Sequence, residues 1–226
     1  MAKQVKSKQR VADHGEVFTA EREVKAMCDL VADECLRIDS RFLEPACGDG
    51  NFLAEILGRK LDRVTTLYKK SPYDWERNAL LALGSIYGVE LLMDNVLVCR
   101  ERLYKLWDER YKKAVKKKEQ NDDVRESAKY ILSLNIICGN ALSLHCVDDT
   151  GQDTETPIIF SQWAFATGPM MKREDYMFEE LLHRDDPKEE YQQISLDFSQ
   201  DQSDDDEGTL IKIYPPIHYR RLKEYA

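Results

Sequence analysis

Residues 42–53 read Phe-Leu-Glu-Pro-Ala-Cys-Gly-Asp-Gly-Asn-Phe-Leu, and this stretch decides the fold class. It predicts a short apolar strand, an acid at the end of that strand, a glycine-rich turn and the first turn of a helix. Gly48 and Gly50 have no side chain, so the backbone of the turn can pass close to a ligand. Ligands of open α/β sheets bind beyond the carboxyl ends of the strands, where we expect Glu44. A carboxylate there favours a cationic or hydroxyl-rich ligand over a pyrophosphate, which binds at a helix N-terminus.

The same residues resemble the Asp/Glu-Pro-Ala-Cys-Gly-Ser-Gly-Asn-Phe-Leu cofactor motif of S-adenosylmethionine-dependent DNA methyltransferases. They are most similar to the modification subunits of restriction-modification systems, which methylate adenine N6. The sequence departs from the usual spelling at Glu44, where the family mostly has Asp, and at Asp49, where it mostly has Ser. The resemblance implies a class I methyltransferase fold, which is α/β and Rossmann-like with a doubly wound, mostly parallel sheet. It also implies S-adenosylmethionine as the cofactor and DNA as the substrate.

Three other segments follow in the order that this family has. Residues 15–20, Gly-Glu-Val-Phe-Thr-Ala, resemble its Gly-x-[Phe/Val]-[Phe/Tyr]-Thr-Pro element, in which Thr19 would meet the amino-acid end of the cofactor. Glu90 ends the predicted strand 85–90, where an acid can accept hydrogen bonds from both ribose hydroxyls. Residues 139–142, Gly-Asn-Ala-Leu, resemble Gly-Asp-Ala-Leu, in which the side chain at 140 accepts a hydrogen bond from the adenine amino group.

By resemblance, the cofactor-binding residues are therefore Thr19, Glu44, Pro45, Ala46, Cys47, Gly48, Gly50, Phe52, Glu90, Leu91, Asn140 and Ala141. Three of them also have ordinary structural interpretations when each is taken alone. Thr19 suits a helix N-cap, Glu90 a solvated strand end and Asn140 a turn.

The catalytic motif of the family is not intact in this chain. Amino-methyltransferases of this kind carry [Asn/Asp/Ser]-Pro-Pro-[Tyr/Phe/Trp] after the fourth strand, where polar atoms accept from the target amino group and the ring stacks on a flipped base. Residues 158–164 read Ile-Ile-Phe-Ser-Gln-Trp-Ala, without a proline, and two registers are possible. One keeps the aromatic residue and the other keeps a hydroxyl. The candidate catalytic residues are Ser161, Gln162 and Trp163, and the Pro215-Pro216 pair is interpreted as a structural turn.

Three explanations stay open for the altered motif. The site is a variant in which those three residues act, or the chain is a degenerate homologue that still binds the cofactor, or it is an accessory subunit completed by a partner. The 226 residues leave no room for the separate target-recognition region that such DNA enzymes usually carry, which favours a partner or a loss of activity. A specificity subunit or another restriction-modification subunit is the expected partner.

Charge is distributed unevenly along the chain. The net charge is −9, but residues 174–208 hold 14 acids and 2 bases, which leaves 28 acids and 31 bases elsewhere. This distribution permits DNA binding.

Two segments are candidate partner-binding sites. Residues 100–118 are basic and contain aromatic residues, which suits either contact with phosphates or a solvated helix face. The segment from Gln193 to Phe198, Gln-Ile-Ser-Leu-Asp-Phe, resembles peptides that dock on the DNA sliding clamp. The alternative is that this acidic stretch is only a spacer.

The expected organisation has four parts. A flexible basic N-terminus (1–14) precedes a cofactor-binding domain (15–182), an acidic linker whose composition predicts disorder (183–208) and a docking C-terminal segment (209–226). We expect helices over 21–36, 51–60 and 93–118, strands over 41–43, 85–90, 135–142, 157–160 and 210–214, and loops over 69–78 and 148–156. Six scattered cysteines predict buried thiols rather than a metal site. No apolar run of membrane-spanning length occurs, and we expect a cytoplasmic protein without a membrane partner.

Overall fold

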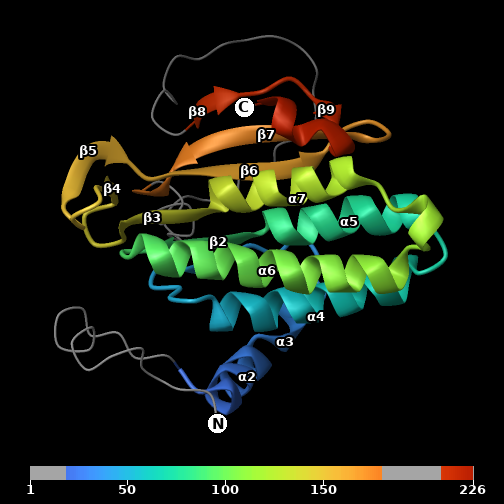
Figure 1. Ribbon diagram of the computed structural model, residues 1–226, viewed down its shortest axis with the longest axis horizontal. Helices are drawn as coiled ribbons and strands as arrows, with labels where there is room; N and C mark the ends of the chain where they lie inside the picture. The colour runs from blue at the N-terminus through green and yellow to red at the C-terminus, as the bar shows by residue number, and fades with distance from the viewer. Residues whose placement is uncertain (1–18, 180–209, 226) are drawn as a thin grey trace, which may run out of the picture.

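A computed structural model describes residues 19–179 and 210–225 of the chain (Figure 1). Its helices and strands alternate in the first half and are mostly strands in the second half. In chain order they are α2 (Glu21–Leu30), α3 (Ala32–Leu36), β1 (Phe42–Glu44), α4 (Asn51–Tyr68), α5 (Pro72–Gly84), β2 (Ile86–Glu90), α6 (Met93–Ala114), η1 (Lys117–Glu119), α7 (Asp122–Asn135), β3 (Ile136–Asn140), β4 (His145–Val147), β5 (Asp153–Pro157), β6 (Ile159–Phe165), β7 (Met170–Met177), β8 (Leu210–Ile213), β9 (Ile217–His218) and η2 (Tyr219–Tyr225).

The first sheet has five strands in the order β1-β2-β3-β4-β5. Strands β1, β2 and β3 are parallel, with Glu44 beside Gly88 and Glu90 beside Cys138. The β4–β5 hairpin continues the sheet in antiparallel fashion. Helices connect the parallel strands, so the fold is α/β with a mixed, mostly parallel sheet that is compatible with a Rossmann-like fold.

The two faces of this sheet are covered by different kinds of element. Ile86 and Ile136 share a core with the apolar sides of α4, α5, α6 and α7. Tyr87 and Val89 point to the opposite face, where they pack with Ile158, Phe160 and Phe178 next to and within β6 and β7. Among the described elements, strands therefore cover the face on which the doubly wound prediction requires a second layer of helices. Figure 1 shows α4 to α7 running together, with β6 to β8 along one side.

The second sheet corrects the predicted fourth parallel strand. Strand β6 pairs with β7 along its whole length in antiparallel fashion, and β7 pairs in turn with β8 and β9. Phe160, Ser161 and Trp163 are buried on β6, and β7 occupies a segment for which no strand was expected. The antiparallel hairpin with β7 places residues 159–165 outside the parallel sheet.

Two helices and one hairpin occupy segments that we expected to be loops or left unassigned. Helix α5 begins after Ser71, whose side chain accepts a hydrogen bond from the Asp74 N–H, and Pro72 takes its first position. Helix α7 begins after Asn121, which caps it through the Asp123 N–H. Both caps were readable in the sequence. The expected loop 148–156 contains most of β5, and the expected helix 21–36 is broken at Val31.

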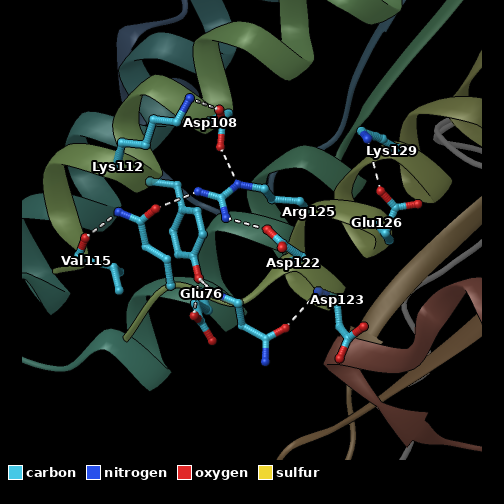
Figure 2. Close-up of polar contacts among 12 residues, drawn as sticks. Glu76, Asp108, Lys112, Val115, Asp122, Asp123, Arg125, Glu126 and Lys129 are labelled. Atoms are coloured by element: carbon cyan, nitrogen blue, oxygen red, sulfur yellow. Dashed lines mark hydrogen bonds and ion pairs between the residues drawn. The ribbon is translucent and has the colours of Figure 1, made fainter. Parts of the chain in front are cut away.

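The C-terminal segment packs on the helices through a buried polar network. Glu76 on α5 is fully buried and accepts hydrogen bonds from the Tyr111 and Tyr219 hydroxyls, at 2.6 Å each, and from Arg220, at 2.7 Å. In Figure 2 this carboxylate lies near a second network, in which Arg125 on α7 pairs with Asp108 on α6 at 2.7 Å. The two networks fix η2, α5, α6 and α7 relative to one another.

Several predictions lie outside the described residues, among them the segments 1–14 and 183–208 and the peptide 193–198. Within the described residues all six cysteines are free thiols. Cys28, Cys35, Cys47 and Cys99 are buried, as the sequence predicts, whereas Cys138 and Cys146 are only half-buried. None of the described helices combines the length and the apolar composition needed to cross a membrane.

Candidate functional site

A cavity of about 670 Å³ opens at the carboxyl ends of the three parallel strands. Glu44 ends β1, Glu90 ends β2 and Asn140 ends β3, and all three residues line it. This is the edge at which open α/β sheets bind ligands. The complete lining consists of Thr19, Glu44, Pro45, Ala46, Cys47, Gly48, Asp49, Asn51, Phe52, Glu90, Leu91, Leu92, Gly139, Asn140, Ala141 and Leu142.

The turn after β1 forms one wall of the cavity. The Cys47 N–H donates to the Val89 carbonyl at 2.9 Å, which holds the turn against β2. Gly48 and Gly50 both have positive φ, of 53° and 87°, a region that favours glycine. A Cβ on Gly50 would lie 2.6 Å from the Cys99 sulfur. Gly50 does not line the cavity, so its role in this structure is to let α4 pack on α6.

The Glu90 carboxylate is held at the cavity wall by the loop that follows it and by the turn after β1. One oxygen accepts from the Gly48 N–H at 2.9 Å, and the other accepts from the Leu92 N–H at 3.0 Å and from the Asn95 amide at 3.3 Å. A carboxylate offers about four acceptor positions. The side chain is therefore fixed in place and still has capacity to accept a hydrogen bond from a ligand hydroxyl.

The Glu44 carboxylate is half-buried at the other side of the same wall. Burial raises its pKa above the ordinary value, and a hydrogen bond from the Ala46 N–H at 3.3 Å partly offsets that rise. Among the described residues that line the cavity, none is a lysine or an arginine. Asp49, the third acid of the lining, is paired with Arg102, which leaves the Glu44 and Glu90 carboxylates without a cation in the described part of the lining. They produce a negative potential, which favours a cationic ligand and disfavours phosphate.

Asn140 and Thr19 complete the set of polar side chains. The Asn140 oxygen accepts from the Leu142 N–H at 3.0 Å, and its amide nitrogen donates to Asp153, with N–O distances of 3.0 and 3.3 Å. Thr19 lies one residue before the N-cap position of α2, which is Ala20, and no side chain caps that helix. Thr19 lines the cavity instead.

All predicted cofactor residues except Gly50 thus lie around one cavity. Sequence reasoning missed Asp49, Asn51, Leu92, Gly139 and Leu142, each of which adjoins a predicted residue. Asp49 and Asn51 both bond to Arg102 on α6, and the Asp49–Arg102 distance is 2.8 Å. Nothing local to the turn indicates this partner, because Arg102 is 53 residues further along the chain.

The three candidate catalytic residues, which the resemblance would place beside the cofactor, lie away from this cavity. The Ser161 hydroxyl is buried between Asp175, at 2.7 Å, and Arg173, at 2.9 Å. Trp163 packs against Gly84, which lies just before the start of β2, so it lies near the amino ends of the parallel strands. Gln162 accepts a long hydrogen bond from Arg41 at 3.4 Å. None of the three lines the cavity at the carboxyl ends.

The basic helix α6 uses much of its charge within the fold. Arg100 donates to the Ile136 carbonyl at 2.9 Å, Arg110 pairs with Asp62 at 2.9 Å and Lys112 pairs with Asp108 at 2.5 Å. Its aromatic residues Trp107 and Tyr111 are fully buried. These contacts agree with a packed helix whose polar face is solvated, and they leave few of its cations for phosphate contacts.

Comparison with known proteins adds no relative. No family model, no curated protein and no solved structure matches this chain. Within the described residues, no group of three or more His, Cys, Asp or Glu side chains is arranged to hold a metal ion.

Proposed function

We propose that the cavity at the ends of β1, β2 and β3 binds S-adenosylmethionine. The observation that carries the proposal is the convergence of Glu44, Glu90 and Asn140 on one cavity whose described lining contains no lysine or arginine. S-adenosylmethionine carries a sulfonium and an ammonium group, two ribose hydroxyls and an adenine amino group. Each of these is a cation or a hydrogen-bond donor, and each has an acceptor in this lining.

The cavity residues fit distinct parts of that ligand. Glu90, fixed by backbone N–H groups of both neighbouring loops, would accept from one ribose hydroxyl through its remaining acceptor position. Asn140 would accept from the adenine amino group. Glu44 and Thr19 would hold the methionine end, where the ammonium and sulfonium charges favour an ionised Glu44. When bound, the cofactor would supply an electrophilic methyl group.

The finer assignment is that the chain has a class I methyltransferase fold similar to DNA adenine-N6 methyltransferases of restriction-modification systems. The residues 42–53 and the order of the four segments support it, and so does the parallel arrangement of β1, β2 and β3. In this function the chain would transfer a methyl group to a base amino group in DNA.

A second candidate is an accessory subunit that keeps the cofactor site and acts through DNA or a protein partner. The position of β6 favours it, because Ser161, Gln162 and Trp163 lie away from the cavity and Ser161 is bonded to Asp175 and Arg173. The acceptor side of the reaction would then come from a partner subunit, such as a specificity subunit.

Calorimetry with the full chain tests cofactor binding. We expect S-adenosylmethionine to bind and ATP, which shares the adenosine but carries a triphosphate, to bind at least about tenfold more weakly, a difference of about 1.4 kcal/mol. Equal or tighter binding of ATP would contradict the proposal. Transfer of labelled methyl groups into unmethylated DNA by the chain alone then separates the two candidates, since turnover removes the accessory one.

A further inference from the structure

The Asn140 amide is held in one orientation by two partners of opposite kind. Its nitrogen donates to both oxygens of Asp153, at 3.0 and 3.3 Å, and its oxygen accepts from the Leu142 N–H at 3.0 Å. A carboxamide presents an oxygen and an NH2 group of nearly the same shape, so its partners decide which group faces a ligand. A carboxylate only accepts hydrogen bonds, and Asp153 therefore always selects the NH2 group.

The β4–β5 hairpin brings Asp153 to this position. Asn140 ends β3 and pairs with His145 on β4, and β5 begins with Asp153, which lies across from Val147. The Leu142 N–H occupies one of the two lone pairs of the Asn140 oxygen. The second lone pair remains for a donor in the cavity that Asn140 lines.

We propose that Asp153 is a positioning residue for base recognition, an inference that rests on the proposed function. By holding the Asn140 oxygen as an acceptor, it makes the cavity select a base with an exocyclic amino group, such as adenine, over a 6-oxo base, such as hypoxanthine. The same contact accounts for Asn at position 140. A carboxylate there would lie about as close to Asp153 as the amide nitrogen does, at 3.0 Å, and the two like charges would repel.

The first experiment compares S-adenosylhomocysteine with S-inosylhomocysteine, its hypoxanthine counterpart, by calorimetry on the full chain. We expect the unaltered protein to prefer the adenosyl ligand by about tenfold or more, because the 6-oxo group would face an acceptor. In Asp153→Ala only the Leu142 N–H still opposes a turned amide, so the preference should fall by about threefold or more. Asp153 is exposed, so the substitution leaves the core intact. Glu155→Ala is the matched control, because it removes an exposed acid from the same strand, and its preference should stay unchanged.

A pair of substitutions gives a readout that a merely structural role would not move. Asn140→Asp alone should weaken binding of S-adenosylhomocysteine at neutral pH, since it sets two carboxylates against each other. In the Asp153→Asn background the same Asn140→Asp change should strengthen binding, because the amide introduced at position 153 then donates to a charged acceptor that faces the amino group. The sign of the effect should reverse between the two backgrounds.

The outcomes are distinguishable. If the unaltered chain binds neither ligand, both the proposed function and the role of Asp153 are wrong. If it binds the adenosyl ligand but Asp153→Ala keeps the full preference, or Asn140→Asp has the same sign in both backgrounds, only the role of Asp153 is overturned.

Discussion

Glu44 at the cavity and the acids of the helix and second-sheet cores differ in how completely they are paired. Glu76 is fully buried and bonds to two tyrosine hydroxyls and an arginine, and Asp175 is bonded to Ser161, Arg173 and Tyr214. Glu44 accepts from the Ala46 N–H and faces the cavity. A fully paired buried acid stabilises a fold, whereas a partly desolvated acid beside a cavity has acceptor capacity that a ligand can use.

This difference sets Glu44 apart from the acids that stabilise the fold. By the same criterion Ser161 has a structural role, because its buried hydroxyl donates to Asp175 and accepts from Arg173. Substituting one acid at a time shows whether stability or ligand affinity responds, and so tests the division.

The largest effect is expected for Glu76→Ala. The substitution leaves the Tyr111 and Tyr219 hydroxyls buried without their acceptor and removes the partner of Arg220. Breaking a buried, charged network in this way should lower the free energy of unfolding by about 3–5 kcal/mol. Urea denaturation followed by circular dichroism measures it.

Glu126→Ala is the control for Glu76, because the side chains of the Glu126–Lys129 pair on α7, drawn in Figure 2, are about half exposed. Its loss should change stability by less than about 1 kcal/mol. An equal loss of unfolding free energy in the two variants would mean that the buried network contributes no more to stability than a partly exposed ion pair.

Glu90→Ala should act mainly on affinity. Removing the acceptor for a ribose hydroxyl should weaken S-adenosylmethionine binding by about 1.5–3 kcal/mol, or about 10- to 150-fold. Some stability is lost as well, since the Gly48 and Leu92 N–H groups lose their acceptor. Calorimetry on folded protein separates the two effects. Glu101→Ala, at an exposed acid of α6 that pairs with Lys105, is the control and should bind normally.

The contrast between the two regions also shows what the sequence could and could not predict. Glu44, Glu90 and Asn140 were found because each ends its own strand, so a local pattern and the geometry of parallel strands place all three at one edge. The position of Ser161 and Trp163 depends on pairing between β6 and β7 and on burial of Trp163 against Gly84, which lies 79 positions away in the chain. The packing against Gly84 has no local signature, whereas the β6–β7 hairpin, whose loop holds Gly168, and the missed helices α5 and α7 did have readable turn and cap residues.

The pH dependence of binding sharpens the assignment of Glu44. Burial raises the pKa of this acid in the free protein, so its ionisation makes the fold less stable as pH rises from the ordinary value through the raised one. Affinity for the cationic cofactor should change in the opposite direction. It should rise with pH across that window, by at most about tenfold per pH unit for a single proton.

Calorimetry with S-adenosylmethionine between acidic and neutral pH measures the Glu44 effect. Glu44→Gln should flatten the profile, and S-adenosylhomocysteine, which lacks the sulfonium charge, should give a shallower slope in the unaltered protein. A slope that survives in Glu44→Gln would assign the proton to another group.

The smallest effect is expected for Asp49→Ser, which restores the residue that the resembled motif mostly has. Asp49 lines the cavity, but its carboxylate is paired with Arg102 at 2.8 Å, and the Arg102 side chain is about a third exposed. We expect the substitution to cost about 1 kcal/mol or less of stability in urea denaturation. Because Asp49 is already neutralised by Arg102, cofactor affinity should change by less than about threefold.

Arg102→Ala tests this reason. The substitution frees the Asp49 charge at the cavity wall, so it should strengthen binding of the cationic cofactor. The double substitution of Asp49 and Arg102 should return affinity to the level of Asp49→Ser. A large affinity loss in Asp49→Ser alone would move Asp49 from the paired acids to those that contact the ligand.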